Sequence, residues 1–121
     1  MIAPARPLVV IYDGNCRFCR AFAHVARRAA RPPGVRLLPF GHPAAEAVLS
    51  SLHADDRYSS VHALRGRELY SATDAFRVIL SRMRGGDVFI RTGAYRIYPV
   101  VVRHRNTIGR LVPDMSQPPI D

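Results

Sequence analysis

The sequence has 121 residues, 48% hydrophobic and 22% charged, which is the size and balance of one globular domain. No apolar run approaches the ~20 residues that cross a bilayer, and the first ten residues lack the basic start and apolar stretch of a cleavable signal peptide. The 18 basic residues, all arginine, outnumber the 9 acidic ones, so with a net charge of +9 the surface should attract anions. We expect a cytoplasmic protein with no membrane contact.

The first predicted elements are a strand, a turn and a helix. Residues Leu8–Tyr12 are all apolar and mostly β-branched or aromatic, which predicts a fully buried strand. Three turn-forming residues, 13–15, interrupt it. A helical pattern then runs from Cys16 to about Ala30 and ends at Pro32-Pro33-Gly34. Its predicted apolar stripe consists of Phe18, Phe22, Val25 and Ala29.

The middle of the sequence predicts a second strand, a short helix and a hairpin. The strand covers Val35–Phe40, and the helix, with a proline in its first turn, covers Pro43–Leu52. Residues Ala54–Arg57 are predicted to be a polar loop. Short strands at Ser60–Leu64 and Glu68–Tyr70 flank Arg65-Gly66, which indicates a tight turn.

The last predicted elements are helical. Ser71 and Asp74 resemble a capping box at the start of a helix that Gly85-Gly86 ends. Its predicted apolar face consists of Phe76, Ile79, Leu80 and Met83. Another helix is predicted from Tyr95 to about Asn106, with Pro99 causing a kink or a late start. Residues 112–121 carry three prolines and few anchors, so we expect a flexible tail.

This order of elements predicts an α/β fold with a four-stranded mixed sheet. The first two strands flank a helical crossover and should be parallel, whereas the last two form a hairpin. Helices should cover both faces of the sheet, with an extra helix at the C-terminal end. The whole chain, 1–121, is predicted to be a single domain with its core at about 7–110.

Cys16 and Cys19 are the two cysteines of the chain, and they are spaced C-x-x-C at the predicted start of a helix. The positive end of the helix and the neighbouring Arg17 favour a thiolate over a thiol. Cys19 lies one helical turn further on, within disulfide distance. We therefore predict thiol–disulfide exchange with a protein or a low-molecular-weight thiol or disulfide. Cys16, nearer the exposed helix end, attacks, and Cys19, pointing inward, resolves the mixed disulfide.

Two other interpretations of the cysteines remain open. A C-x-x-C pair is often half of a zinc site, but the five histidines are scattered and do not supply the second half. The two cysteines could also be buried and inert. A disulfide between them would close a very short loop and stabilise the fold little. No metal and no cofactor is therefore predicted.

Residues beside the cysteines complete the predicted site. Asp13 either caps the helix through its side chain or accepts the proton of Cys19 during resolution. The residues predicted to contact the substrate are Tyr12, Gly14, Asn15, Arg17 and Phe18. For Tyr12 and Phe18 a place in the core or in a groove wall is the alternative, and for Gly14 a backbone role.

The run from Val10 to Cys19 resembles the signature of the DCC family of thiol–disulfide oxidoreductases, Asp-Gly-x-Cys-x-x-Cys directly after the first strand. Two further segments resemble that family: Ser71–Phe76, and Arg105–Arg110 with its Arg-Asn…Gly-Arg pattern. The resemblance spans roughly residues 8–110. It implies a thioredoxin-like fold and redox roles for Cys16 and Cys19, with Asp13 as the signature acid.

The arginines suggest an alternative function. They gather on the predicted first helix and near the C-terminal end, at Arg103, Arg105 and Arg110. Such a face could bind an acidic protein or another anionic partner, in which case the chain would be a non-catalytic binding module. Nucleic acid is the less favoured partner, because no recognised motif and no aromatic stacking platform accompanies the arginines.

Overall fold

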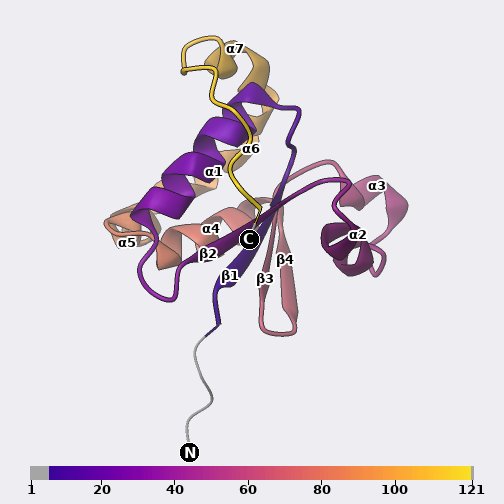
Figure 1. Ribbon diagram of the computed structural model, residues 1–121. Coiled ribbons are helices and arrows are strands. Elements are labelled where there is room, and N and C mark those ends of the chain that lie inside the picture. Colours follow the sequence, from indigo (N-terminus) through magenta and orange to yellow (C-terminus); the bar gives the residue numbers. More distant parts are fainter. Residues whose placement is uncertain (1–5, 121) are drawn as a thin grey trace, which may run out of the picture.

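The computed structural model describes residues 6–120; the first five residues and Asp121, which belong to the predicted N-terminal stretch and tail, lie outside the described residues. Its sheet contains β1 (Leu8–Tyr12), β2 (Val35–Pro39), β3 (His62–Arg65) and β4 (Glu68–Ser71) in the order β2-β1-β3-β4. β1 and β2 are parallel, and β3 is antiparallel to both β1 and β4. The predicted mixed sheet is confirmed (Figure 1).

Helices cover both faces of this sheet. α1 (Arg17–Ala29) and α4 (Ala72–Arg82) pack on one face, where their buried residues join those of β1 in the larger core cluster. α2 (Pro43–Leu49) packs on the other face against Ile11 and Leu38. This arrangement confirms the predicted thioredoxin-like α/β fold. No helix within residues 6–120 is both long and apolar enough to cross a membrane.

α1 packs on the sheet through small residues together with part of the predicted stripe. Ala23 and Ala26 are fully buried, whereas Val25 is 52% exposed, so its predicted place in the stripe is wrong. Small alanine side chains let α1 pack close to the sheet, so the side of α1 that carries Ala23 and Ala26 is buried and the side that carries Val25 is exposed. Phe22 and Ala29 of the stripe do pack against the core.

Three local predictions are wrong. Residues Ala54–Arg57 form a short helix, α3, rather than a loop, because the side chain of His53 accepts a hydrogen bond from the Asp55 N–H and caps it. The second helix ends at Leu49 instead of Leu52. Ser71 precedes α4 without capping it, because its hydroxyl bonds Nδ1 of the buried His62 at 2.7 Å.

The C-terminal part is more divided than the sequence indicates. α4 ends at Arg82, and Gly85, in the left-handed conformation, precedes α5 (Gly86–Arg91). The single helix predicted from Tyr95 consists of three pieces: η1 (Ala94–Ile97), α6 (Tyr98–Arg103) and α7 (Arg105–Gly109). Pro99 stands in the first turn of α6, where its missing N–H leaves no bond unmade. The prediction of a late helix start at Pro99 is therefore confirmed, whereas the prediction of one continuous helix is wrong.

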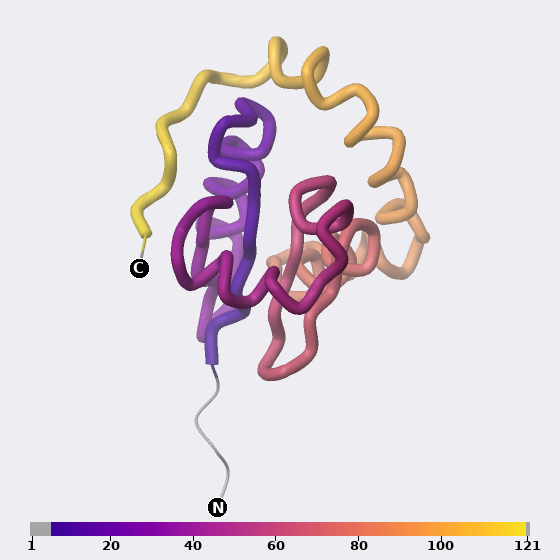
Figure 2. The backbone as a smooth tube through the Cα atoms, turned by 90° about the vertical axis from the view of Figure 1, so that its right-hand side faces the viewer, coloured from indigo at the N-terminus to yellow at the C-terminus, as the bar shows by residue number. Residues whose placement is uncertain are grey.

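After α7 the chain turns back and runs along α1 without forming a helix or strand up to residue 120 (Figure 2). Side chains of α1 hydrogen-bond the backbone carbonyls of this segment, which we call the tail, residues 112–120. Pro118 is almost completely buried. The tail therefore has more anchors than its sequence indicates, and its flexibility remains a prediction.

Candidate functional site

The two cysteines lie where β1 gives way to α1. Cys16 is the N-cap of α1, and its Sγ accepts a hydrogen bond from the Cys19 N–H at 3.2 Å. Both thiols are free and partly buried. The first turn of a helix has N–H groups without intrahelical partners, and the Cys16 sulfur accepts one of them. The geometry places Cys16 at the positive end of α1.

Cys19 differs from Cys16 in its surroundings. It packs against the larger core cluster, as expected for a side chain that points inward. Burial raises the pKa of the Cys19 thiol strongly, and the hydrogen bond and charge of Cys16 raise it further. Arg105 opposes this shift, and Asp13 adds to it. Cys19 therefore stays a thiol at neutral pH unless a nearby group removes its proton.

Asp13 does not cap α1, because Cys16 occupies that position. Instead Asp13 Oδ1 accepts a hydrogen bond from the Asn15 N–H at 2.9 Å, which holds the turn between strand and helix. Its carboxylate also lines the same cavity as Cys19. Of the two predicted roles, the helix cap is thus wrong, and the proton acceptor remains a prediction.

The five residues predicted to contact substrate have different environments. Tyr12 and Phe18 line the cavity next to Cys19, and burial raises the pKa of Tyr12, whose hydroxyl has no hydrogen-bond partner among the described residues. Gly14 lies so close to the tail that a Cβ there would stand 2.6 Å from Gln117 Oε1. Asn15 is exposed, and the Arg17 guanidinium donates to the Val112 carbonyl at 2.7 Å. The structure thus brings Tyr12 and Phe18 to the cavity and directs Arg17 to the tail.

The cavity has a volume of about 270 Å³ and lies at the edge of the sheet where β1 ends. Its walls also come from Phe40 after β2 and from Ser60 and Val61 before β3, because the last residues of β1 and β2 and the first residues of β3 lie at the same edge of the sheet. Most of the wall is apolar. The aromatic residues are Tyr12, Phe18, Phe22, Phe40, Phe76 and Tyr98, and the aliphatic residues of α6 and α7 are Val101, Val102 and Ile108.

Sequence reasoning missed much of this wall. Tyr98 and Val101 belong to a predicted helix with no assigned partner, and Ile108 lies just beyond the predicted end of that helix, near Asn106. The available signal was the apolar run of residues 98–102, of which Tyr98, Val101 and Val102 line the cavity while Val100 is 55% exposed. Arg105 also lines the cavity, although the sequence analysis placed it in the basic face.

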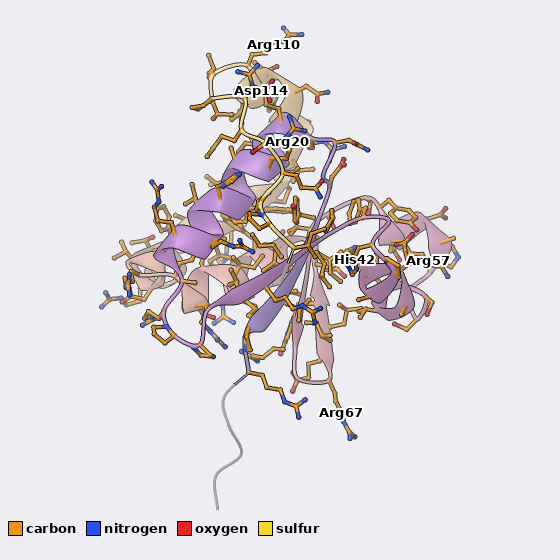
Figure 3. All side chains as sticks on the ribbon, in the orientation of Figure 1. Arg20, His42, Arg57, Arg67, Arg110 and Asp114 are labelled. Atoms are coloured by element: carbon orange, nitrogen blue, oxygen red, sulfur yellow. The ribbon has the colours of Figure 1, made fainter. Side chains whose placement is uncertain are left out.

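Part of the basic face of α1 is covered by the chain itself. Arg20 donates to the carbonyls of Gly14 and Met115 and pairs with Asp114 at 2.9 Å, as Figure 3 shows for Arg20 and Asp114. His24 bonds the carbonyl of Ser116, and Arg27 donates to that of Pro119. An acidic partner remains a prediction, and these side chains already have partners.

Metal binding finds no ready-made site among the described residues. Within residues 6–120 no group of three or more histidine, cysteine, aspartate or glutamate side chains is placed to hold an ion. The second half of a zinc site is therefore missing beside Cys16 and Cys19 in this part of the chain.

Comparison with known proteins gives one match. The family described as DCC1-like thiol-disulfide oxidoreductase matches residues 10–111 of the 121-residue chain. No curated protein and no solved structure matches. The matched segment begins within β1, ends just after α7, and contains both cysteines, Asp13 and the cavity walls.

Proposed function

The chain belongs to the DCC1-like thiol-disulfide oxidoreductase family, and from this premise we propose that Cys16 and Cys19 exchange a disulfide with a thiol or disulfide substrate. The observation that carries the proposal is the unequal placement of the two sulfurs. Cys16 is at the helix end and accepts the Cys19 N–H, whereas Cys19 packs against the core. An activated nucleophile and a protected second thiol are what two-step exchange requires.

The reaction starts with the Cys16 thiolate, which attacks a substrate sulfur and breaks the substrate disulfide. A mixed disulfide forms, and one substrate thiolate leaves. Asp13 then accepts the proton of Cys19, which attacks Cys16 Sγ and expels the second substrate sulfur. The protein is oxidised by two electrons, the substrate is reduced, and the reverse sequence oxidises a dithiol substrate.

The first test is a redox titration in glutathione buffers, followed by alkylation and intact mass. We expect a reversible two-electron transition at roughly −270 to −180 mV, the range of exchange proteins. Cys19→Ser should accumulate a mixed disulfide with glutathione, and Cys16→Ser should form none. A pair that stays reduced at every poise, or a mixed disulfide on Cys19 alone, would contradict the proposal.

Asp13 is tested by Asp13→Asn, which keeps an acceptor for the Asn15 N–H and removes the base. We expect the first step to be unchanged and the second, release from the mixed disulfide, to slow about 100-fold. A role limited to holding the turn predicts instead that the rate of the second step and its pH profile stay as in the wild type. Rapid quench and mass analysis follow both steps separately.

A further inference from the structure

The cavity beside Cys19 has the dimensions of a small-molecule site. Its volume of about 270 Å³ lies near the lower end of ligand pockets, roughly 300–1,000 Å³. Aromatic and aliphatic side chains form most of its wall, with Cys19 among them. A site of this size and composition suits a compact apolar body, not the polar surface of a hydrophilic peptide such as glutathione.

Arg105 is the only basic residue among those that line the cavity. It is partly buried, and its guanidinium forms no hydrogen bond or ion pair with any residue between 6 and 120. Arg17 and Arg20, by contrast, donate to carbonyls of the tail. An anion at this position would form charge-assisted hydrogen bonds with the partly buried guanidinium.

Asp13, the acidic residue in the same wall, does not fill that role in the structure. Its Oδ1 accepts from the Asn15 N–H, and it forms no ion pair with Arg105. The Asp13 carboxylate therefore has a hydrogen-bond donor in the turn, whereas the Arg105 guanidinium has no acceptor within residues 6–120.

We propose that the substrate of the Cys16–Cys19 pair is a small carboxylic acid whose apolar chain carries a disulfide or dithiol, with the chain in this cavity and the carboxylate on Arg105. The inference rests on the proposed function and specifies its substrate class. The apolar wall matches the chain of such a molecule, and the Arg105 guanidinium, which has no acceptor within residues 6–120, matches its carboxylate. The disulfide would lie beside Cys19, whose N–H donates to the sulfur of the attacking Cys16.

A peptide substrate fits this wall less well. An extended peptide that adds to a protein as a further strand pairs with free main-chain groups of an exposed segment. Val61, which lines the cavity just before β3, has none: its N–H donates to the Tyr98 hydroxyl at 3.1 Å, and its carbonyl accepts from the Ala72 N–H at 3.0 Å.

The electron balance is that of the proposed exchange. Cys16 attacks one sulfur of the substrate disulfide, Cys19 attacks Cys16, and the substrate leaves as a dithiol. One disulfide breaks and one forms, and the two electrons and two protons of the cysteine pair pass to the substrate. No further oxidant or reductant takes part.

Binding is tested without redox chemistry in the Cys16→Ser, Cys19→Ser double variant. Titration calorimetry with octanoate should show saturable binding, and neutral octanamide should bind about tenfold more weakly. Arg105→Gln should remove this difference. Arg103→Gln, a neighbouring exposed arginine outside the cavity, should keep it. Absence of octanoate binding, or equal effects of the two arginine variants, overturns the carboxylate site.

Exchange is tested in the wild-type dithiol with three disulfides: lipoate, neutral lipoamide and oxidised glutathione. Lipoate should react about tenfold faster than lipoamide, and Arg105→Gln should abolish that preference. Exchange with glutathione and no octanoate binding would overturn this inference and leave the proposed function standing. Octanoate binding with no exchange of any disulfide would instead contradict the proposed function. Faster exchange with a Phe-containing cystine peptide than with lipoate would identify a peptide substrate.

Discussion

The two sides of α1 differ in what they contact. On one side Phe18, Cys19 and Phe22 line a cavity that no side chain from residues 6–120 fills. On the other side Arg20, His24 and Arg27 bind the backbone of the tail, so the chain covers this side itself. The same helix thus presents an open apolar wall and a closed polar one.

This difference separates arginines that stabilise the fold from arginines available to a ligand. Guanidinium groups on the tail side donate to carbonyl oxygens of the chain, so some of their five N–H donors already have acceptors. Arg105 stands on the cavity side and has no such acceptor within residues 6–120. A count of basic residues does not distinguish the two groups, although their expected roles differ.

The largest expected effect concerns the thiol of the cavity side. In Cys16→Ser, burial still raises the pKa of Cys19, although the contributions from the Cys16 sulfur are lost. Iodoacetamide should therefore alkylate Cys19 more than about tenfold more slowly than a small free thiol at pH 8, since one pKa unit is a tenfold change in thiolate. The rate should climb as the pH rises above 9. The same variant unfolded in urea is the control, and fast alkylation of the folded form would contradict the burial of Cys19.

Phe22→Ala tests the cavity side for its share of stability. Phe22 packs against the core and lies 5.7 Å from Phe76 between ring centroids. Its truncation should lower the free energy of unfolding by about 3 kcal/mol. Val25→Ala, on the same helix but 52% exposed, should cost less than about 0.5 kcal/mol. Urea denaturation gives both values, and equal losses would place Phe22 outside the core.

Arg20→Met tests the tail side. The substitution keeps the stem but removes the donors to Gly14, Met115 and Asp114. We expect a loss of about 1–2 kcal/mol in the free energy of unfolding and faster proteolysis within the tail. Arg28→Met, which alters an exposed arginine of the same helix, is the matched control. Similar behaviour of the two variants would mean that the tail does not depend on α1.

Asp114→Asn should give the smallest effect. The Asp114 side chain is 67% exposed, so water and salt screen its ion pair with Arg20. We expect a change below about 0.5 kcal/mol, shrinking further at high salt, while the carbonyl bonds of Arg20 remain. A loss above about 1 kcal/mol in the free energy of unfolding would show that the Asp114 carboxylate, and not the backbone of the tail, makes the main contact with Arg20.

Local patterns in the sequence were enough for the sheet and for the cysteine pair. The apolar run Leu8–Tyr12, the turn residues after it and the C-x-x-C spacing act over a few residues, so their outcome hardly depends on the rest of the fold. Other predictions are wrong because a distant group competes with the local one for the same hydrogen-bond partner. Ser71 has a cap within reach in sequence, yet the buried His62 takes its hydroxyl.

The sequence by itself determined the α/β order of elements, the position of Cys16 at a helix start and the redox family, because these follow from short-range pattern and spacing. Only the tertiary structure decided which residues line the cavity and which arginines have partners within the chain. Phe40, Val61 and Ile108 are far apart in sequence and meet where the sheet edge and α7 converge. Arg20 and Arg105 are the same residue type, and one has a carbonyl within reach while the other faces an apolar wall.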